Sequence, residues 1–191
     1  MRIDLRIYKK QLRSEMRAIR AAMSPALRGE KDRLIFHRLI RLPQYHQAHT
    51  IITYVSTAQE VDTRRLMERA WADGKKVVVP RCVPGTHRME MFYIHSMDEL
   101  EPGSYGILEP NASAESCKNW KGSLCVVPAF CNDRKGYRLG YGGGYYDRFL
   151  SQYKGTTVGI NYSECVREQI HHGRYDVPLQ MLLTEREKIR F

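Results

Sequence analysis

The chain has 191 residues, enough to bury one hydrophobic core, and hydrophobic residues make up 42% of it, an ordinary share for a globular protein. No stretch approaches the roughly 18 uncharged apolar residues of a membrane-spanning helix, and the charged N-terminus lacks the apolar part of a secretory signal. We therefore expect a cytoplasmic protein. The formal charge of +10 is concentrated in residues 1–41, which hold twelve basic and four acidic residues and suit an anionic partner.

Residues 2–23 are predicted to form an amphipathic helix, because apolar and basic side chains follow two stripes with helical spacing. The apolar stripe holds Leu5, Tyr8, Leu12, Met16, Ile19 and Met23, and the basic stripe holds Arg6, Lys10, Arg13, Arg17 and Arg20. A second helix is predicted to begin after Ser24, which is a favourable N-cap, with Pro25 at its first position. It would run to about Leu42.

Strand-like and helical segments alternate in the rest of the chain. We predict strands at residues 50–56, 76–81, 89–94, 124–127, 156–160 and 179–183, helices at 63–73, from about 144 and around 164–170, and a loop-rich region at 96–122. This alternation predicts a single α/β domain over residues 1–191, a three-layer α/β/α fold with a mainly parallel central sheet. Ligands of such sheets bind at the carboxyl ends of the strands, where the segment after Val127 begins.

The segment 133–148 carries the chemistry, since five of its sixteen residues are glycine and three of these are consecutive. Glycine can take positive φ and let backbone N–H groups surround phosphate oxygens, and a helix starting near Gly144 would add its positive end. Arg138 can supply a cationic contact, and Asp147 can bind Mg²⁺ that bridges phosphates. Tyr141, Tyr145 and Tyr146 offer faces on which an adenine or a pterin can stack. By itself the pattern predicts a phosphate site, and the alternative is a glycine turn before a surface helix.

The stretch RLGYGGGYYDR, preceded by VVPAFCNDRKGY, resembles the signature of the 5-formyltetrahydrofolate cyclo-ligase (methenyltetrahydrofolate synthetase) family. Other stretches resemble landmarks of the same family in the same order: KKQLR (9–13), YVSTAQEVDT (54–63), GKKVVVPR (74–81), YGILEP (105–110) and DVPL (176–179). The resemblance covers nearly the whole chain. It implies a cytoplasmic, ATP- and Mg²⁺-dependent ligase of folate one-carbon metabolism that closes 5-formyltetrahydrofolate to 5,10-methenyltetrahydrofolate and releases ADP and phosphate.

The resemblance also implies which residues form the site, with Lys10 and Arg138 as catalytic cations. The implied ATP-binding residues are Lys9, Lys10, Gln11, Leu12, Arg13, Arg138, Leu139, Gly140, Tyr141, Gly142, Gly143, Gly144, Tyr145 and Tyr146. The implied folate-binding residues are Val55, Glu60, Tyr141, Gly142, Gly143, Gly144 and Tyr145. Asp147 and Asp176 are the implied magnesium ligands, and this chain has Gln180 where many relatives have aspartate.

The implied reaction needs no nucleophile from the protein, because the formyl oxygen attacks the γ-phosphorus of ATP and N10 of the folate then attacks the activated carbon. The protein would position the substrates and stabilise charge. Its expected partners are these two small molecules, with no nucleic acid or membrane, and it is expected to be a monomer. The five cysteines and seven histidines show no metal-ligand spacing. Two other classes stay open: a non-catalytic nucleotide- or folate-binding homologue, and a basic nucleic-acid-binding module.

Overall fold

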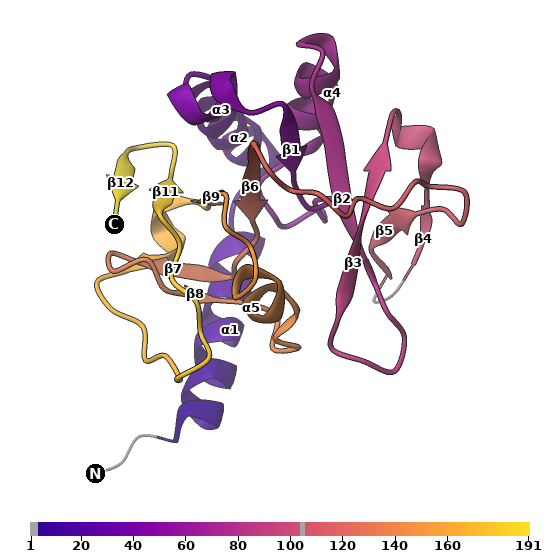
Figure 1. Ribbon diagram of the computed structural model, residues 1–191. Coiled ribbons are helices and arrows are strands. Elements are labelled where there is room, and N and C mark those ends of the chain that lie inside the picture. The colour runs from indigo at the N-terminus through magenta and orange to yellow at the C-terminus, as the bar shows by residue number, and fades with distance from the viewer. Residues whose placement is uncertain (1–3, 104–105) are drawn as a thin grey trace.

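The computed structural model describes residues 4–103 and 106–191, and its centre is a seven-stranded sheet (Figure 1). The strands, in sheet order, are β12 (Lys188–Arg190), β11 (Met181–Leu183), β9 (Thr156–Ile160), β6 (Ser123–Val127), β1 (Thr50–Ile52), β2 (Lys76–Cys82) and β3 (Met89–Ile94). The five strands from β11 to β2 are parallel to their neighbours, and antiparallel β12 and β3 form the two edges. This confirms the predicted α/β class with a mainly parallel sheet.

Helices cover both faces of this sheet. They are α1 (Leu5–Ala21), α2 (Pro25–Ile40), α3 (Pro43–Gln47), α4 (Arg64–Ala72) and α5 (Tyr145–Leu150). Neighbouring strand residues point to opposite faces, so Ile51 packs with α2, α3 and α4 while Ile52 packs with Phe149 of α5. The three layers are therefore present, and Figure 1 shows α2, α3 and α4 grouped at one end of the sheet. In the part of the chain that the structure describes, no helix is long and apolar enough to cross a membrane.

Helix α1 packs mainly on a second, smaller sheet. This sheet consists of β10 (Val166–Arg167), β7 (Cys131–Asp133) and β8 (Arg138–Leu139), in that order. Leu12 and Met16 of α1 are buried against it, in a cluster with Phe130. Tyr8 and Ile19 pack against the same cluster, so the predicted apolar stripe is confirmed from Tyr8 to Ile19. At its ends the prediction is wrong, since Leu5 is exposed and Met23 lies beyond the end of the helix at Ala21. Residues 2 and 3 of the predicted helix lie outside the described residues.

Several boundaries differ from the predictions because tertiary hydrogen bonds decide them. The helix predicted around residues 164–170 is wrong: a 3₁₀ turn (η3, Ser163–Cys165) leads into strand β10, which pairs with β7. The second helix does begin at Pro25 with Ser24 as its N-cap, but it ends at Ile40, and the separate helix α3 follows. Residues 96–122, predicted as loop, contain η1 (Met97–Glu99) and the hairpin of β4 (Leu100–Pro102) and β5 (Leu108–Pro110).

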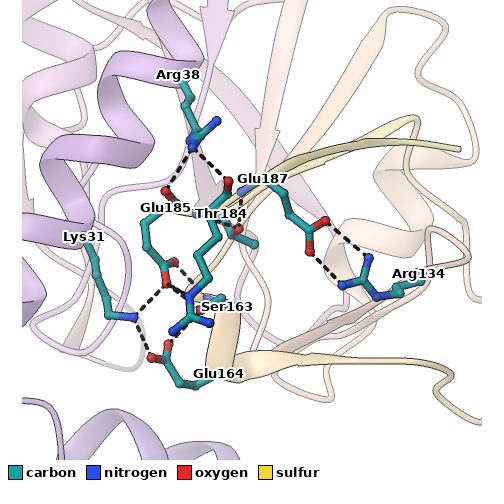
Figure 2. A network of polar contacts seen from close by, with 9 residues as sticks. Lys31, Arg38, Arg134, Ser163, Glu164, Thr184, Glu185 and Glu187 are labelled. Carbon is teal, nitrogen blue, oxygen red and sulfur yellow. Dashed lines mark hydrogen bonds and ion pairs between the residues drawn. The ribbon is translucent and has the colours of Figure 1, made fainter.

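A buried lysine attaches α2 to the C-terminal part of the chain (Figure 2). The ammonium group of Lys31 donates to Glu164 at 2.6 Å and to Glu185 at 2.7 Å, and Lys31 and Glu185 are both buried. Glu185 also accepts from the backbone N–H of Ser163 at 3.0 Å. Burial opposes ionisation of Glu185, but the contacts with Lys31 and Ser163 hold its pKa below the ordinary value of 4.5. The network therefore joins α2, η3 and the end of β11 through paired charges.

We predict that Lys31→Met lowers the free energy of unfolding by about 3 kcal/mol, because it leaves the buried Glu185 with only the exposed Arg186, 3.6 Å away, as a cation. Arg134→Met is the control, since Arg134 pairs with Glu187 at an exposed position and its loss should leave stability almost unchanged (Figure 2). Urea titration at pH 7 measures both changes.

The pH dependence provides a second check. Because the folded pKa of Glu185 is lowered, its contribution is complete above the ordinary value of 4.5 and is lost as the pH falls through the folded value. The difference between the wild type and Lys31→Met should therefore shrink in acid. Equal losses of unfolding free energy for Lys31→Met and Arg134→Met would show that the buried pair of Lys31 and Glu185 stabilises the protein no more than an exposed ion pair does.

Candidate active site

A cavity of about 520 Å³ opens at the carboxyl ends of β1, β2 and β6. Val55 follows β1, Cys82 ends β2 and Pro128 follows β6, and all three line the cavity. Helix α1 and the glycine-rich segment supply the remaining polar wall. The cavity therefore lies at the strand ends, where the fold class predicts a ligand site.

The glycine-rich segment has the backbone conformation that the sequence predicts. Gly142 has φ +107° and Gly144 has φ +69°, in the left-handed region that favours glycine. Gly144 is the N-cap of α5 and provides no side-chain cap. The guanidinium of Arg13 donates to the carbonyl oxygen of Gly140 at 2.8 Å, and a Cβ atom on Gly142 would lie 3.3 Å from the same guanidinium. The segment thus packs closely against α1.

Two cations that the sequence assigns to the ATP site are paired with the two carboxylates that it assigns to magnesium. Arg138 is buried and donates to Asp147 at 2.7 Å and to the carbonyl oxygen of Val177 at 2.7 Å. Lys9 donates to Asp176 at 2.5 Å. Burial opposes ionisation of Asp176, but the hydrogen bond from Lys9 keeps its pKa below its usual value. Both pairs line the cavity, so four predicted site residues meet there.

The two carboxylates suit a magnesium ion that arrives with a nucleotide. Within residues 4–103 and 106–191, no group of three or more His, Cys, Asp or Glu side chains could hold a metal ion. Mg²⁺ needs only one or two carboxylates when substrate phosphates supply further oxygens. Asp147 and Asp176 fit that requirement, whereas a permanent metal centre made of protein ligands alone does not fit these residues.

The cavity is also lined by the predicted folate contacts Val55 and Glu60, both buried. One carboxylate oxygen of Glu60 accepts from the backbone N–H and the hydroxyl of Thr57, each at 2.9 Å. The other oxygen accepts from the hydroxyl of Tyr141. Burial and the neighbouring Glu60 raise the pKa of Tyr141 above its usual value, so its hydroxyl stays protonated and can donate.

Three predicted residues lie away from the cavity. Lys10 and Gln11 are exposed on α1, and Leu12 is buried against the small sheet, so only Lys9 and Arg13 of this stretch line the cavity. The reason is helical geometry, because residues four apart share a face and the intervening ones do not.

All of the predicted segment Arg138–Tyr146 lines the cavity, together with Asp147. Gln180 does not, since its side-chain oxygen accepts from the backbone N–H of Thr157 at 3.1 Å.

Sequence reasoning missed several lining residues. They are Tyr54, Pro80, Cys82, Met89, Ile107, Leu108, Glu109 and Pro128. Glu109 is buried and accepts from the backbone N–H of Cys82 at 3.1 Å. Burial and Glu109 raise the pKa of the Cys82 thiol to about 11, which makes it a neutral group and no nucleophile at neutral pH. The YGILEP stretch was the available signal for Glu109; its Tyr105 lies outside the described residues.

We predict that Arg138→Met lowers the free energy of unfolding by about 2 kcal/mol, because the buried guanidinium holds both Asp147 and the Val177 carbonyl. Asp147→Asn should also destabilise the protein, since it leaves Arg138 without its countercharge. The double variant should lose less unfolding free energy than the two single variants together, and urea unfolding of the wild type and the three variants measures this coupling. Additive losses would show that the pair does not act as a unit.

A model of the 5-formyltetrahydrofolate cyclo-ligase family matches residues 6–185. The chain is 29% identical to a probable 5-formyltetrahydrofolate cyclo-ligase of Schizosaccharomyces pombe, over 96% of this chain and 98% of that protein. It is 28% identical to a 5-formyltetrahydrofolate cyclo-ligase of Haemophilus influenzae, over 92% and 97% of the two chains. A solved structure of Aquifex aeolicus 5,10-methenyltetrahydrofolate synthetase is similar with a TM-score of 0.84 and 30% identity, covering 95% of this chain and 92% of the other.

Proposed function

The chain belongs to the 5-formyltetrahydrofolate cyclo-ligase family, a family of ligases, and on that premise we propose that it closes 5-formyltetrahydrofolate to 5,10-methenyltetrahydrofolate with ATP and Mg²⁺, releasing ADP and phosphate. We further propose that it acts as a monomer in the cytoplasm, on these small molecules and not on nucleic acid or membranes. The observation that carries the proposal is the single cavity that joins a wall of cations and glycines to a wall with Val55 and Glu60.

The cationic wall is suited to the triphosphate of ATP. Lys9, Arg13 and Arg138 come from α1 and β8 and converge on the same cavity as the glycines. Lysine and arginine neutralise phosphate charge, and glycine N–H groups can donate where a side chain would block the approach. Asp147 and Asp176 would hold Mg²⁺, which supplies charge neutralisation between neighbouring phosphate groups.

The wall with Glu60 is suited to the pterin. Its carboxylate can accept from the amino-pyrimidine edge, while the aromatic rings of Tyr141 and Tyr145 offer flat surfaces. The hydroxyl of Tyr141 donates to one oxygen of Glu60. Binding of the pterin would therefore exchange this internal hydrogen bond for one to the substrate.

The proposed reaction has two steps, and both use nucleophiles of the substrate. The formyl oxygen attacks the γ-phosphorus, the bond between phosphorus and the bridging oxygen breaks, and ADP leaves. N10 then attacks the activated formyl carbon, its proton leaves, and the carbon–oxygen bond breaks to release phosphate. Because phosphorylation makes the oxygen a good leaving group, the protein has to align the two substrates and stabilise charge, which the paired cations can do.

The direct test is the absorbance of 5,10-methenyltetrahydrofolate. We expect product only when 5-formyltetrahydrofolate, ATP and Mg²⁺ are all present, with one phosphate released per ring closed. A non-catalytic homologue would bind the folate or ATP without forming product. A nucleic-acid-binding module would instead bind oligonucleotides with a steep dependence on salt and show no turnover. Either result would contradict the proposal.

A comparison of two neighbouring lysines tests whether ATP binding depends on a charge in the cavity wall or on the positive charge of α1 in general. Lys9 lines the cavity and Lys10 is exposed beside it. We predict that Lys9→Met raises the KM for ATP by about tenfold more than Lys10→Met does, because only the first removes a charge from the cavity wall. Steady-state kinetics at varied ATP measures this difference. A larger effect of Lys10→Met would assign the phosphate contact to Lys10 instead, as the family resemblance implies.

A further inference from the structure

Arg20, near the end of α1, is a charged residue buried behind the cavity wall. Only 2% of its surface is exposed. Its guanidinium donates to the carbonyl oxygens of Ala129 and Phe130 and to the side chain of Asn161 at 2.9 Å. These carbonyls belong to the segment that directly follows β6, where the chain enters the cavity wall. Arg20 therefore holds the segment that links the central sheet to the site.

The contacts continue from Arg20 to the predicted folate wall. The guanidinium carbon of Arg20 lies 5.4 Å from the centroid of the Phe130 ring. Phe130 in turn packs against the ring of Tyr141, with centroids 4.4 Å apart. The hydroxyl of Tyr141 donates to Glu60. Arg20, Phe130, Tyr141 and Glu60 thus form one continuous chain of contacts, and only its last two members line the cavity.

Arg20 and Glu60 carry opposite charges that both act on the hydroxyl of Tyr141. Glu60 is 7% exposed and forms no salt bridge with any residue in the described ranges 4–103 and 106–191. A buried carboxylate without a nearby cation is unfavourable. Burial and Glu60 raise the pKa of Tyr141, and the positive charge of Arg20 opposes them, which indicates that Arg20 and Glu60 act on the same hydroxyl.

The burial of Arg20 also has a cost. The Nε atom of Arg20 is buried and has no hydrogen-bond partner. An unsatisfied buried donor is costly, and such a cost is typical of residues retained for a functional site.

We propose that Arg20 is a positioning residue for the folate half of the site, which fixes Phe130 and through it Tyr141 beside Glu60, without touching either substrate. This inference rests on the proposed function. Its effect should fall mainly on the folate, because the last member of these contacts, Glu60, is assigned to the folate alone. The cations predicted to bind ATP, Lys9, Arg13 and Arg138, are held by other contacts.

The test compares Arg20→Met, Arg20→Lys and Arg17→Met. Arg17 is the matched control, since its guanidinium carbon also lies over the Phe130 ring, at 4.9 Å, but the residue is exposed on the same helix. We expect Arg20→Met to raise the KM for 5-formyltetrahydrofolate by about tenfold while the KM for ATP changes less than about twofold. Arg20→Lys, which keeps the charge, should recover part of the loss. Arg17→Met should behave like the wild type.

Phe130→Leu provides an independent variant in case Arg20→Met does not fold, because it removes the ring and keeps a buried apolar side chain. It should show the same selective rise in the KM for the folate. Equal changes in both KM values, or a fall in kcat alone that matches the loss of folded protein, would overturn the inference. If the wild type forms no methenyltetrahydrofolate, the proposed function fails first, and binding of 5-formyltetrahydrofolate measured by calorimetry still compares the variants.

Discussion

The ion pair between Arg138 and Asp147 is the contact on which the geometry of the cavity depends. It joins β8 to α5, and the same two side chains bind the backbone of Val177 through its carbonyl oxygen and its N–H group. Three segments of the polar wall are therefore fixed to one another by one ion pair, whose arginine is buried and whose aspartate is half-buried. Because desolvated charges must be compensated, any ligand that draws Asp147 away has to bring another anion to Arg138. The nucleotide and magnesium ion of the proposed reaction would do both.

The basic N-terminal region follows the same physical rule. Its excess charge resembles an exposed patch for an anionic polymer, yet several of its cations point into the protein. Arg20 and Lys31 are buried, and Arg13 donates to the backbone of Gly140. These residues attach α1 and α2 to the segments after β6, β8, β9 and β11 through carbonyl oxygens and carboxylates. Part of the net charge is thus internal and serves the fold and the cavity, which weakens the case for a nucleic-acid partner.

The predicted folate wall and the predicted phosphate wall are built differently. The phosphate wall consists of ion pairs that a ligand can exchange, such as that of Lys9 with Asp176. The folate wall consists of packed rings and hydrogen bonds that lead back to Arg20 in the interior. The two walls meet at Tyr141 of the glycine-rich segment, whose hydroxyl donates to Glu60, so a change affects mainly one substrate only where it lies away from this residue.

Local patterns in the sequence were sufficient for the main strands, for the N-cap at Ser24 and for the positive φ angles of the glycine segment, because these depend on neighbouring residues. They were insufficient where distant segments compete for hydrogen bonds, as in the strand at Val166–Arg167 that was predicted to be helical. The family resemblance supplied the residues of the site, but not their partners. Lys9 and Asp176 are 167 residues apart, and Tyr141 and Glu60 are 81 apart. Periodicity in the sequence shows which face of a helix or strand is buried or charged. Which distant side chains that face contacts is decided only when the chain folds.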